Sequence, residues 1–129
     1  MYKTLMSALM LAAALTSAGS YANAQKPKID CSKATSTPEV KFCSQQSYVA
    51  ADKQLNQVYK QVQASLTGEP KRLLTTGQQS WIKFRDNNCD FEVYRSRGGT
   101  GYEIFRNGCL ERLTKQRTQD LQNYLSDPK

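Results

Sequence analysis

The 129-residue chain contains no histidine, and this absence narrows the chemistry that it can perform. Histidine is the most frequent general base in enzymes and a common zinc ligand, so both roles lack their usual residue. The cysteines follow one another as C-x11-C and C-x19-C, which is not the spacing of a paired-ligand zinc site. We therefore expect no metal and no catalytic residue.

Long apolar runs are missing after residue 24. The run from Leu5 to Leu15 follows Lys3 and precedes Ala22-Asn23-Ala24, a small-residue cleavage site. Residues 1–24 are therefore predicted to be a secretory signal peptide, since the run is too short to span a bilayer. No cysteine directly follows the run, which argues against a lipobox anchor. We expect residues 25–129 to form a single soluble domain, without a membrane anchor, in the periplasm or outside the cell.

Cysteine is scarce but even in number, with four residues in the exported part of the chain. In a small exported domain this pattern indicates two disulfides, and Cys31, Cys43, Cys89 and Cys109 allow three connectivities. We favour Cys31–Cys43 together with Cys89–Cys109, because each bond then closes a short local loop. A bond between Cys31 and Cys109 would instead pull the N-terminal segment onto the last helix.

Strand-like alternation is absent, and helical periodicity takes its place. Residues 36–39 (STPE) form a helix start with a capping box, and the helical spacing continues to Leu66, with room for a break near residues 43–46. Residues 67–70 (TGEP) end that segment. Further helices are expected from about Pro70 to Tyr94 and from about Tyr102 to Leu125. The predicted fold is all-α: a compact bundle of three long helices plus a short N-terminal helix.

Each expected long helix has an apolar face, which we assign to the core. On the first it consists of Tyr48, Ala51, Leu55, Val58, Tyr59, Val62 and Leu66. On the second it consists of Leu73, Leu74, Trp81, Phe84, Phe91 and Tyr94. On the third it consists of Phe105, Cys109, Leu110, Leu113, Arg117, Leu121 and Tyr124.

Two charged residues fall inside these apolar faces. Arg117 interrupts the face of the third helix, and Asp52 lies next to Ala51 on the first. Since a buried charge needs a partner, we expect Asp52 or Asp86 to pair with Arg117 or Arg85 between helices. Such an ion-pair network fixes how helices are arranged more surely than it adds net stability.

Residues 94–103 (YRSRGGTGYE) connect the last two helices. Gly98 and Gly99 are expected to make the turn, and Thr100 to cap the third helix in a capping box with Glu103. The glycines also suit an anion-binding nest, although the spacing of a phosphate loop is missing. A further hypothesis is a projecting loop that binds a partner. Its contact residues would be Arg95, Arg97, Thr100, Tyr102 and Glu103.

Paired carboxylates offer little support for an enzyme. Asp86 and Asp90 are four residues apart, but acids at that spacing on a helix are usually solvated or ion-paired, and nothing shields one of them as a catalytic acid. Lys and Arg are scattered along the chain rather than clustered, which argues against a nucleic-acid partner. We therefore expect a binding protein that is not an enzyme.

Three motifs follow one another along the chain. They are D-x-x-L-N-x-x-Y from Asp52, Q-x-x-W-x-x-x-R-D-x-x-C from Gln78, and C-L-x-x-L-T-x-x-R from Cys109. In this order they resemble the LprI-type domain, a family of exported bacterial helical domains named after a lysozyme-inhibiting lipoprotein. The resemblance extends over roughly residues 31–125. It implies a disulfide-bonded helical domain without a cofactor or catalytic role, which binds a protein partner, and it suggests lysozyme as that partner.

The charge of the chain complicates this implication. Its formal net charge is +7, and lysozymes of the common animal type are strongly basic, so the two proteins would repel each other. An inhibitor would then need a local acidic patch, and the candidates near the predicted hairpin are Asp86, Asp90, Glu92, Glu103 and Glu111. The alternative is an envelope-binding or stress-response module of the periplasm that uses its positive charge to bind the anionic cell envelope.

Overall fold

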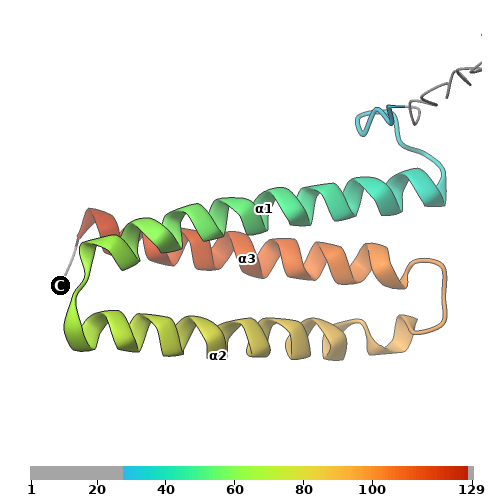
Figure 1. Cartoon of the computed structure of the whole chain (residues 1–129). Helices are drawn as coiled ribbons and strands as arrows, with labels where there is room; N and C mark the ends of the chain where they lie inside the picture. The colour runs from blue at the N-terminus through green and yellow to red at the C-terminus, as the bar shows by residue number, and fades with distance from the viewer. Residues whose placement is uncertain (1–27, 128–129) are drawn as a thin grey trace, which may run out of the picture.

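The computed structural model describes residues 28–127, and the predicted signal peptide lies outside them. These residues form α1 (Thr37–Ser65), α2 (Gly68–Glu92), a short 3-10 turn η1 (Tyr94–Ser96) and α3 (Tyr102–Ser126), as Figure 1 shows. The described part of the chain contains no strand, so the prediction of an all-α fold with three long helices is confirmed.

The start of α1 follows from its local sequence. The Ser36 backbone N–H and hydroxyl both donate to Oε2 of Glu39, at 3.0 and 2.8 Å, as the capping box predicts. From there α1 runs unbroken to Ser65. The separate short helix expected before residue 46 is not seen among the described residues, because no glycine or proline interrupts the chain between Pro38 and Gly68.

The connection between α2 and α3 differs from its prediction at one residue. Gly98 takes the left-handed conformation that the turn needs, with φ +78°. However, α3 begins at Tyr102 with Gly101 as its N-cap, and the side chain of Thr100 makes no hydrogen bond within residues 28–127. Glu103 pairs with Lys41 of α1 instead. The predicted Thr100 cap is therefore wrong, because the expected box partner is held by another helix.

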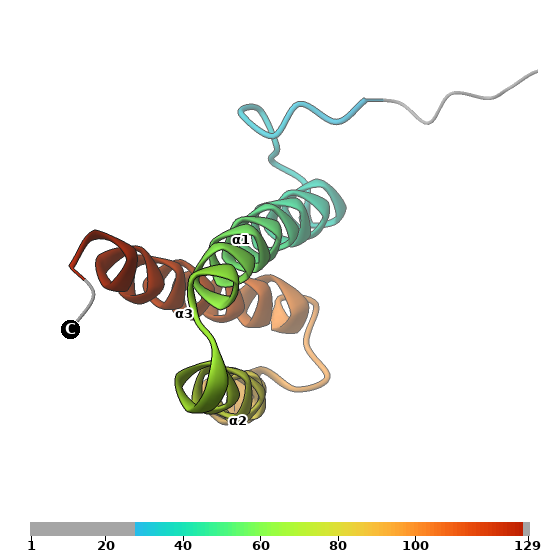
Figure 2. The same ribbon diagram turned by 60° about the vertical axis from the view of Figure 1, so that its left-hand side comes forward.

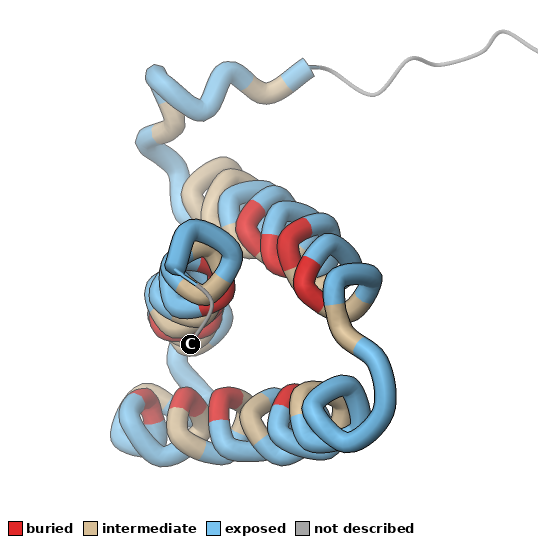
Figure 3. The backbone as a smooth tube through the Cα atoms, turned by 90° about the vertical axis from the view of Figure 1, so that its left-hand side faces the viewer, coloured by how far each residue is buried: buried red, intermediate tan, exposed pale blue. Residues whose placement is uncertain are grey.

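The three helices enclose a shared interior. Figure 2 views α2 nearly end-on, with α1 and α3 lying across it, and Figure 3 shows the buried positions of all three helices facing inward. The interior contains two apolar clusters. One consists of Leu55, Val58, Val62 and Leu121, and the other of Cys89, Cys109 and Leu110.

Polar side chains separate the two apolar clusters. Gln78, Arg85, Thr114 and Thr118 are all buried, and the side chain of Thr114 is fully enclosed. Every buried side-chain nitrogen or oxygen of the described residues has a hydrogen-bond partner, so this polar layer carries no unsatisfied group.

The face that α2 presents to the interior is not the predicted one. Leu73, Phe84, Phe91 and Tyr94 are between 56% and 82% exposed, while Trp81 and Leu74 are partly buried. Cys89 is bonded to Cys109 of α3 and therefore faces inward, and Arg85, one turn earlier, shares its face. The disulfide thus overrides the apolar periodicity of this helix. Phe105 of α3, also expected in the core, is 57% exposed.

The two ends of the molecule are built differently. One of them, the loop end, contains residues 93–101, the start of α1, and both disulfides (Figure 1). The opposite one, the turn end, contains the short link at residues 66–67, where Gly68 opens α2 with φ +61°, and the C-terminal end of α3.

Candidate functional site

Arg85 forms the polar centre of the molecule. Its side chain is about 6% exposed, and it lies 2.9 Å from Oδ1 of Asp86 on its own helix. Its Nη1 donates to Oδ1 of Asp52 on α1 and to Oγ1 of Thr114 on α3, each at 3.2 Å. One guanidinium therefore bonds to side chains from all three helices.

Two aromatic rings enclose the same guanidinium. The carbon Cζ of Arg85 lies 5.4 Å from the ring centre of Tyr48 and 5.3 Å from that of Trp81. Burial disfavours the charged form of Arg85, but its hydrogen bond to the Asp86 carboxylate and the nearby charges outweigh this effect and raise the pKa of Arg85. Burial also raises the pKa of Tyr48. The group keeps a fixed charge, which suits a structural role rather than proton transfer.

Arg117 takes no part in this network. Its Nε donates to Oε1 of buried Gln78 at 3.0 Å, and no carboxylate of the described residues lies within ion-pair distance. Of the pairings expected between helices, that of Asp52 with Arg85 is present, whereas Arg117 pairs with neither Asp52 nor Asp86. The sequence reasoning missed Gln78 and Thr114, although a polar residue at a core position of each helix was the available signal.

The cysteines pair locally. Cys31 is bonded to Cys43 and Cys89 to Cys109, and no free cysteine remains. The second bond joins α2 to α3 next to the connecting loop. Ion pairs between Arg106 and Asp90 (2.6 Å) and between Arg112 and Glu92 (2.7 Å) reinforce the same junction.

The five loop residues expected to bind a partner are divided in the structure. Arg95, Arg97 and Thr100 are exposed, and Arg97 lies over the ring of Tyr94 at 5.2 Å. Tyr102 and Glu103 belong to the first turn of α3 rather than to the loop. They line a hollow of about 220 Å³ together with Gln45, Arg106 and Asn107. The exposed loop tip is thus cationic, whereas Glu103 is engaged by Lys41.

The acidic patch considered near the loop end is neutralised within the chain. Asp86 and Asp90 pair with Arg85 and Arg106, and Glu92 with Arg112. Glu103 pairs with Lys41 and Glu111 with Lys115. None of these acids is left to offer an unpaired charge to a basic partner, so the patch does not exist in the expected form.

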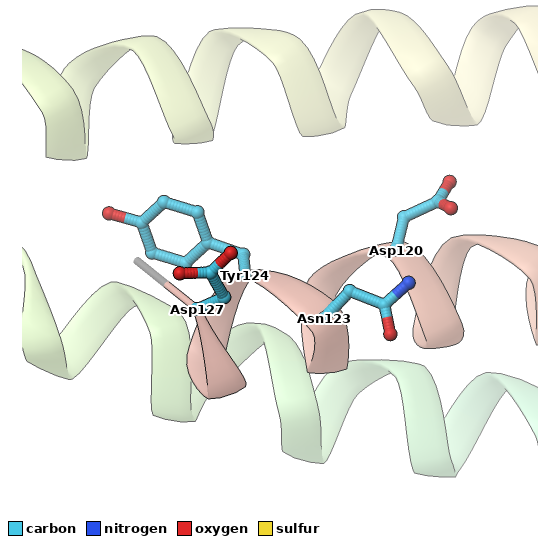
Figure 4. Close-up of a pocket in the computed structure, with 4 residues that line it drawn as sticks. All are labelled: Asp120, Asn123, Tyr124 and Asp127. Carbon is cyan, nitrogen blue, oxygen red and sulfur yellow. The ribbon is translucent and has the colours of Figure 1, made fainter. Parts of the chain in front are cut away.

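A feature that sequence reasoning missed lies at the turn end. An apolar groove of about 420 Å³ opens there between the three helices, with Arg117 and Asp120 at its polar edge. A second hollow of about 370 Å³ adjoins it and is lined by Asp120, Asn123, Tyr124 and Asp127 of α3. In Figure 4 the side chains of Asp120 and Tyr124 extend from α3 toward α2.

Metal and membrane sites were also sought in the structure. Within residues 28–127, no three His, Cys, Asp or Glu side chains gather as a metal site would require. None of the helices described is both long and apolar enough to cross a membrane.

Comparison with known proteins gives one family and one relative. The family model described as lysozyme inhibitor LprI matches residues 30–121, which include α1, α2 and most of α3. An uncharacterized protein of Rhizobium meliloti (strain 1021) is 35% identical, with 81% of this chain and 84% of the relative covered. No solved structure matches the chain.

Proposed function

The chain belongs to the LprI family, and on this basis we propose that it is an exported protein that inhibits a lysozyme by protein–protein contact. The match over residues 30–121 is the observation that carries the proposal, because it covers α1, α2 and most of α3 rather than one motif. Two local disulfides suit a protein that works in the periplasm or is secreted. The family is described as an inhibitor family, which supports a role in binding rather than catalysis.

The proposal is tested with the oxidised protein, beginning at residue 25, in a lysis assay. Lysozymes of several classes are added to a suspension of peptidoglycan, and clearing is measured with increasing protein. We expect at least one class to be slowed with a stoichiometric dependence on the protein. No slowing of any class at high micromolar concentration would sink the proposal.

A second candidate function rests on the loop tip. Arg95 and Arg97 are exposed and have no carboxylate within ion-pair distance among the described residues, although the chain pairs most of its acids. Two unpaired guanidinium groups beside the hydroxyl of Thr100 favour an anionic surface such as the cell envelope.

Co-sedimentation with isolated cell wall tests the second function. The wild-type protein should sediment at low salt and be released as the salt concentration rises. Arg95→Ala with Arg97→Ala should lose most of this binding, whereas Lys53→Ala with Lys60→Ala, which removes equal charge from exposed positions on α1, should keep it. Equal losses in the two double variants would show that net charge, and not the tip, carries the binding.

A further inference from the structure

The groove at the turn end is an uncovered extension of the core. Its apolar walls come from all three helices: Val62, Leu66, Leu73, Leu74, Leu121 and Tyr124. Val62 and Leu121 are buried members of the core cluster, whereas Leu73 at the outer wall is 56% exposed. The volume of about 420 Å³ is large enough for one or two apolar side chains of a partner.

The acids beside this groove differ from the other acids of the chain. All eleven Asp and Glu residues lie within the described part. Eight form ion pairs, and Glu39 accepts the hydrogen bonds of the capping box. The remaining two are Asp120 and Asp127, and the carboxylate of neither has a hydrogen-bond or ion-pair partner among residues 28–127. Both line the hollow that adjoins the groove.

The helix ends add to this negative charge. α1 and α3 both finish at the turn end, and neither has a basic residue in its last turn. The exposed carbonyl groups at a helix C-terminus carry a partial negative charge, which favours a cation. The N-terminus of α2 and Arg117 bring positive charge to the same end, so the negative charge is local to Asp120, Asp127 and the ends of α1 and α3.

We propose that the turn end is a docking surface for a basic protein, whose apolar side chain enters the groove while a neighbouring Lys or Arg meets Asp120 and Asp127. The inference deepens the proposed function, on which the identity of the partner as a lysozyme rests. It also answers the charge objection, since a basic enzyme would meet two unpaired carboxylates on an otherwise basic inhibitor.

The described segment before α1 does not cover this surface. The described chain begins at residue 28, near the start of α1 at the loop end. The groove lies at the other end of α1, a helix of 29 residues. At 1.5 Å per residue the separation is roughly 40 Å. The two unpaired carboxylates beside the groove favour a partner with complementary charge.

Peptide titration tests the docking surface without any lysozyme. The probe is a short peptide with Leu and Trp flanked by lysines, and its counterpart has the same apolar residues flanked by glutamates. NMR should show shifts of backbone amides in residues 117–127 with the lysine peptide, and about tenfold weaker binding of the glutamate peptide at low salt. Equal binding of both peptides, or shifts confined to the loop end, overturns the proposal.

Two double variants complete the test. The double variant Asp120→Asn with Asp127→Asn should bind the lysine peptide about tenfold more weakly than the wild type. The charge-matched double variant Asp30→Asn with Glu111→Gln should bind this peptide with the wild-type affinity. Where the lysis assay shows inhibition, the first pair should lower its potency and the second should not. If the wild type dimerises through this end and Asp120→Asn with Asp127→Asn makes it monomeric, a second copy is the occupant and the inference fails. Peptide binding without inhibition of any lysozyme would reject the proposed function and keep the docking surface.

Discussion

Different interactions join the helices at the loop end and at the turn end. At the loop end a disulfide and two ion pairs connect α2 to α3, and the acids nearby are paired within the chain. At the turn end the helices meet through apolar contacts and through the hydroxyl of Tyr59, which lies 3.3 Å from that of Thr75. The loop end therefore pairs its acids and leaves Arg95 and Arg97 unpaired, while the turn end leaves two unpaired acids beside an apolar groove.

The largest expected effect on stability comes from removing the Cys89–Cys109 disulfide at the loop end. Cys89→Ala with Cys109→Ala should lower the free energy of unfolding by about 3 kcal/mol, because the bond closes a loop with a sequence separation of 20. Urea denaturation of the oxidised wild type and the variant measures the loss. Amide exchange should rise first in residues 89–109 and later at the turn end.

The other disulfide provides the matched control. Cys31→Ala with Cys43→Ala removes a bond between the exposed segment before α1 and its second turn. Loop closure alone would make the two bonds nearly equal, since the sequence separations are 12 and 20. The loss of stability should nevertheless be less than half as large, because the segment before α1 is exposed and adds little to the core. Equal losses of stability from the two double variants would contradict this distinction. It holds that Cys89–Cys109 stabilises the helical bundle, whereas Cys31–Cys43 holds only the segment before α1.

A smaller effect is expected from Arg85, which lies between the two ends. Arg85→Met should lower the free energy of unfolding by about 2 kcal/mol, because the hydroxyl of fully buried Thr114 loses its hydrogen bond. Asp52 adds little to this loss, since its side chain is 39% exposed and still reaches water. Unlike loss of the disulfide, Arg85→Met should raise amide exchange at both ends. Urea denaturation and exchange rates together measure this difference.

The double variant Arg85→Met with Thr114→Val sharpens this test. Replacing both buried polar partners removes the unsatisfied hydroxyl, so about half of the lost stability should return. A double variant less stable than the sum of its single changes would mean that Thr114 supports the fold by some means other than its bond to Arg85.

The smallest effect is a pH dependence at the two acidic helix starts. Hydrogen bonds from the Ser36 backbone and hydroxyl lower the pKa of Glu39 below 4.5, and the bond from Arg72 lowers that of Glu69 at the start of α2. A lowered pKa means that each contribution is present above the unfolded value and is lost as the pH falls through the folded value. NMR titration of both carboxyl groups checks the direction.

Salt should separate the two acids. The donors to Glu39 are mostly neutral, so its pKa should change little with ionic strength, whereas the exposed ion pair of Glu69 should weaken and its pKa rise. Glu39→Gln should remove the acid dependence of amide exchange at the start of α1. A Glu39 pKa at or above 4.5 would refute the assignment.

Sequence reasoning succeeded where local rules decide the structure. The capping box of α1, the glycine turn at residue 98 and the helix boundaries follow from residues that act on their neighbours. It failed for α2, where a covalent bond to α3 turned Cys89 and Arg85 inward and left Phe84 and Phe91 outside. The groove was beyond reach for the same reason, because its walls come from three helices whose relative placement no local rule fixes.

The motifs that carry the family resemblance mostly supply the contacts between helices. Asp52 of the first motif and Thr114 of the third both bond to Arg85 of the second. Gln78 of the second bonds to Arg117 of the third, and Cys89 to Cys109. These motifs therefore identify the architecture with precision, but the residues proposed to meet a partner, Asp120 and Asp127, lie outside them.

The triple bonding of Arg85 also sets the alignment of the helices along their axes. Long helices with apolar faces can slide past each other by one turn, about 5.4 Å, and still bury similar surfaces. Asp52 of α1 and Thr114 of α3 reach the guanidinium of Arg85 in a single alignment, and a slip of one turn would leave that charge with Asp86 of its own helix alone. The bonds of Arg85 thus fix the distance between the loop end and the turn end. The two proposed contacts, of the loop tip with the cell envelope and of the turn end with a basic protein, are therefore held at a constant separation.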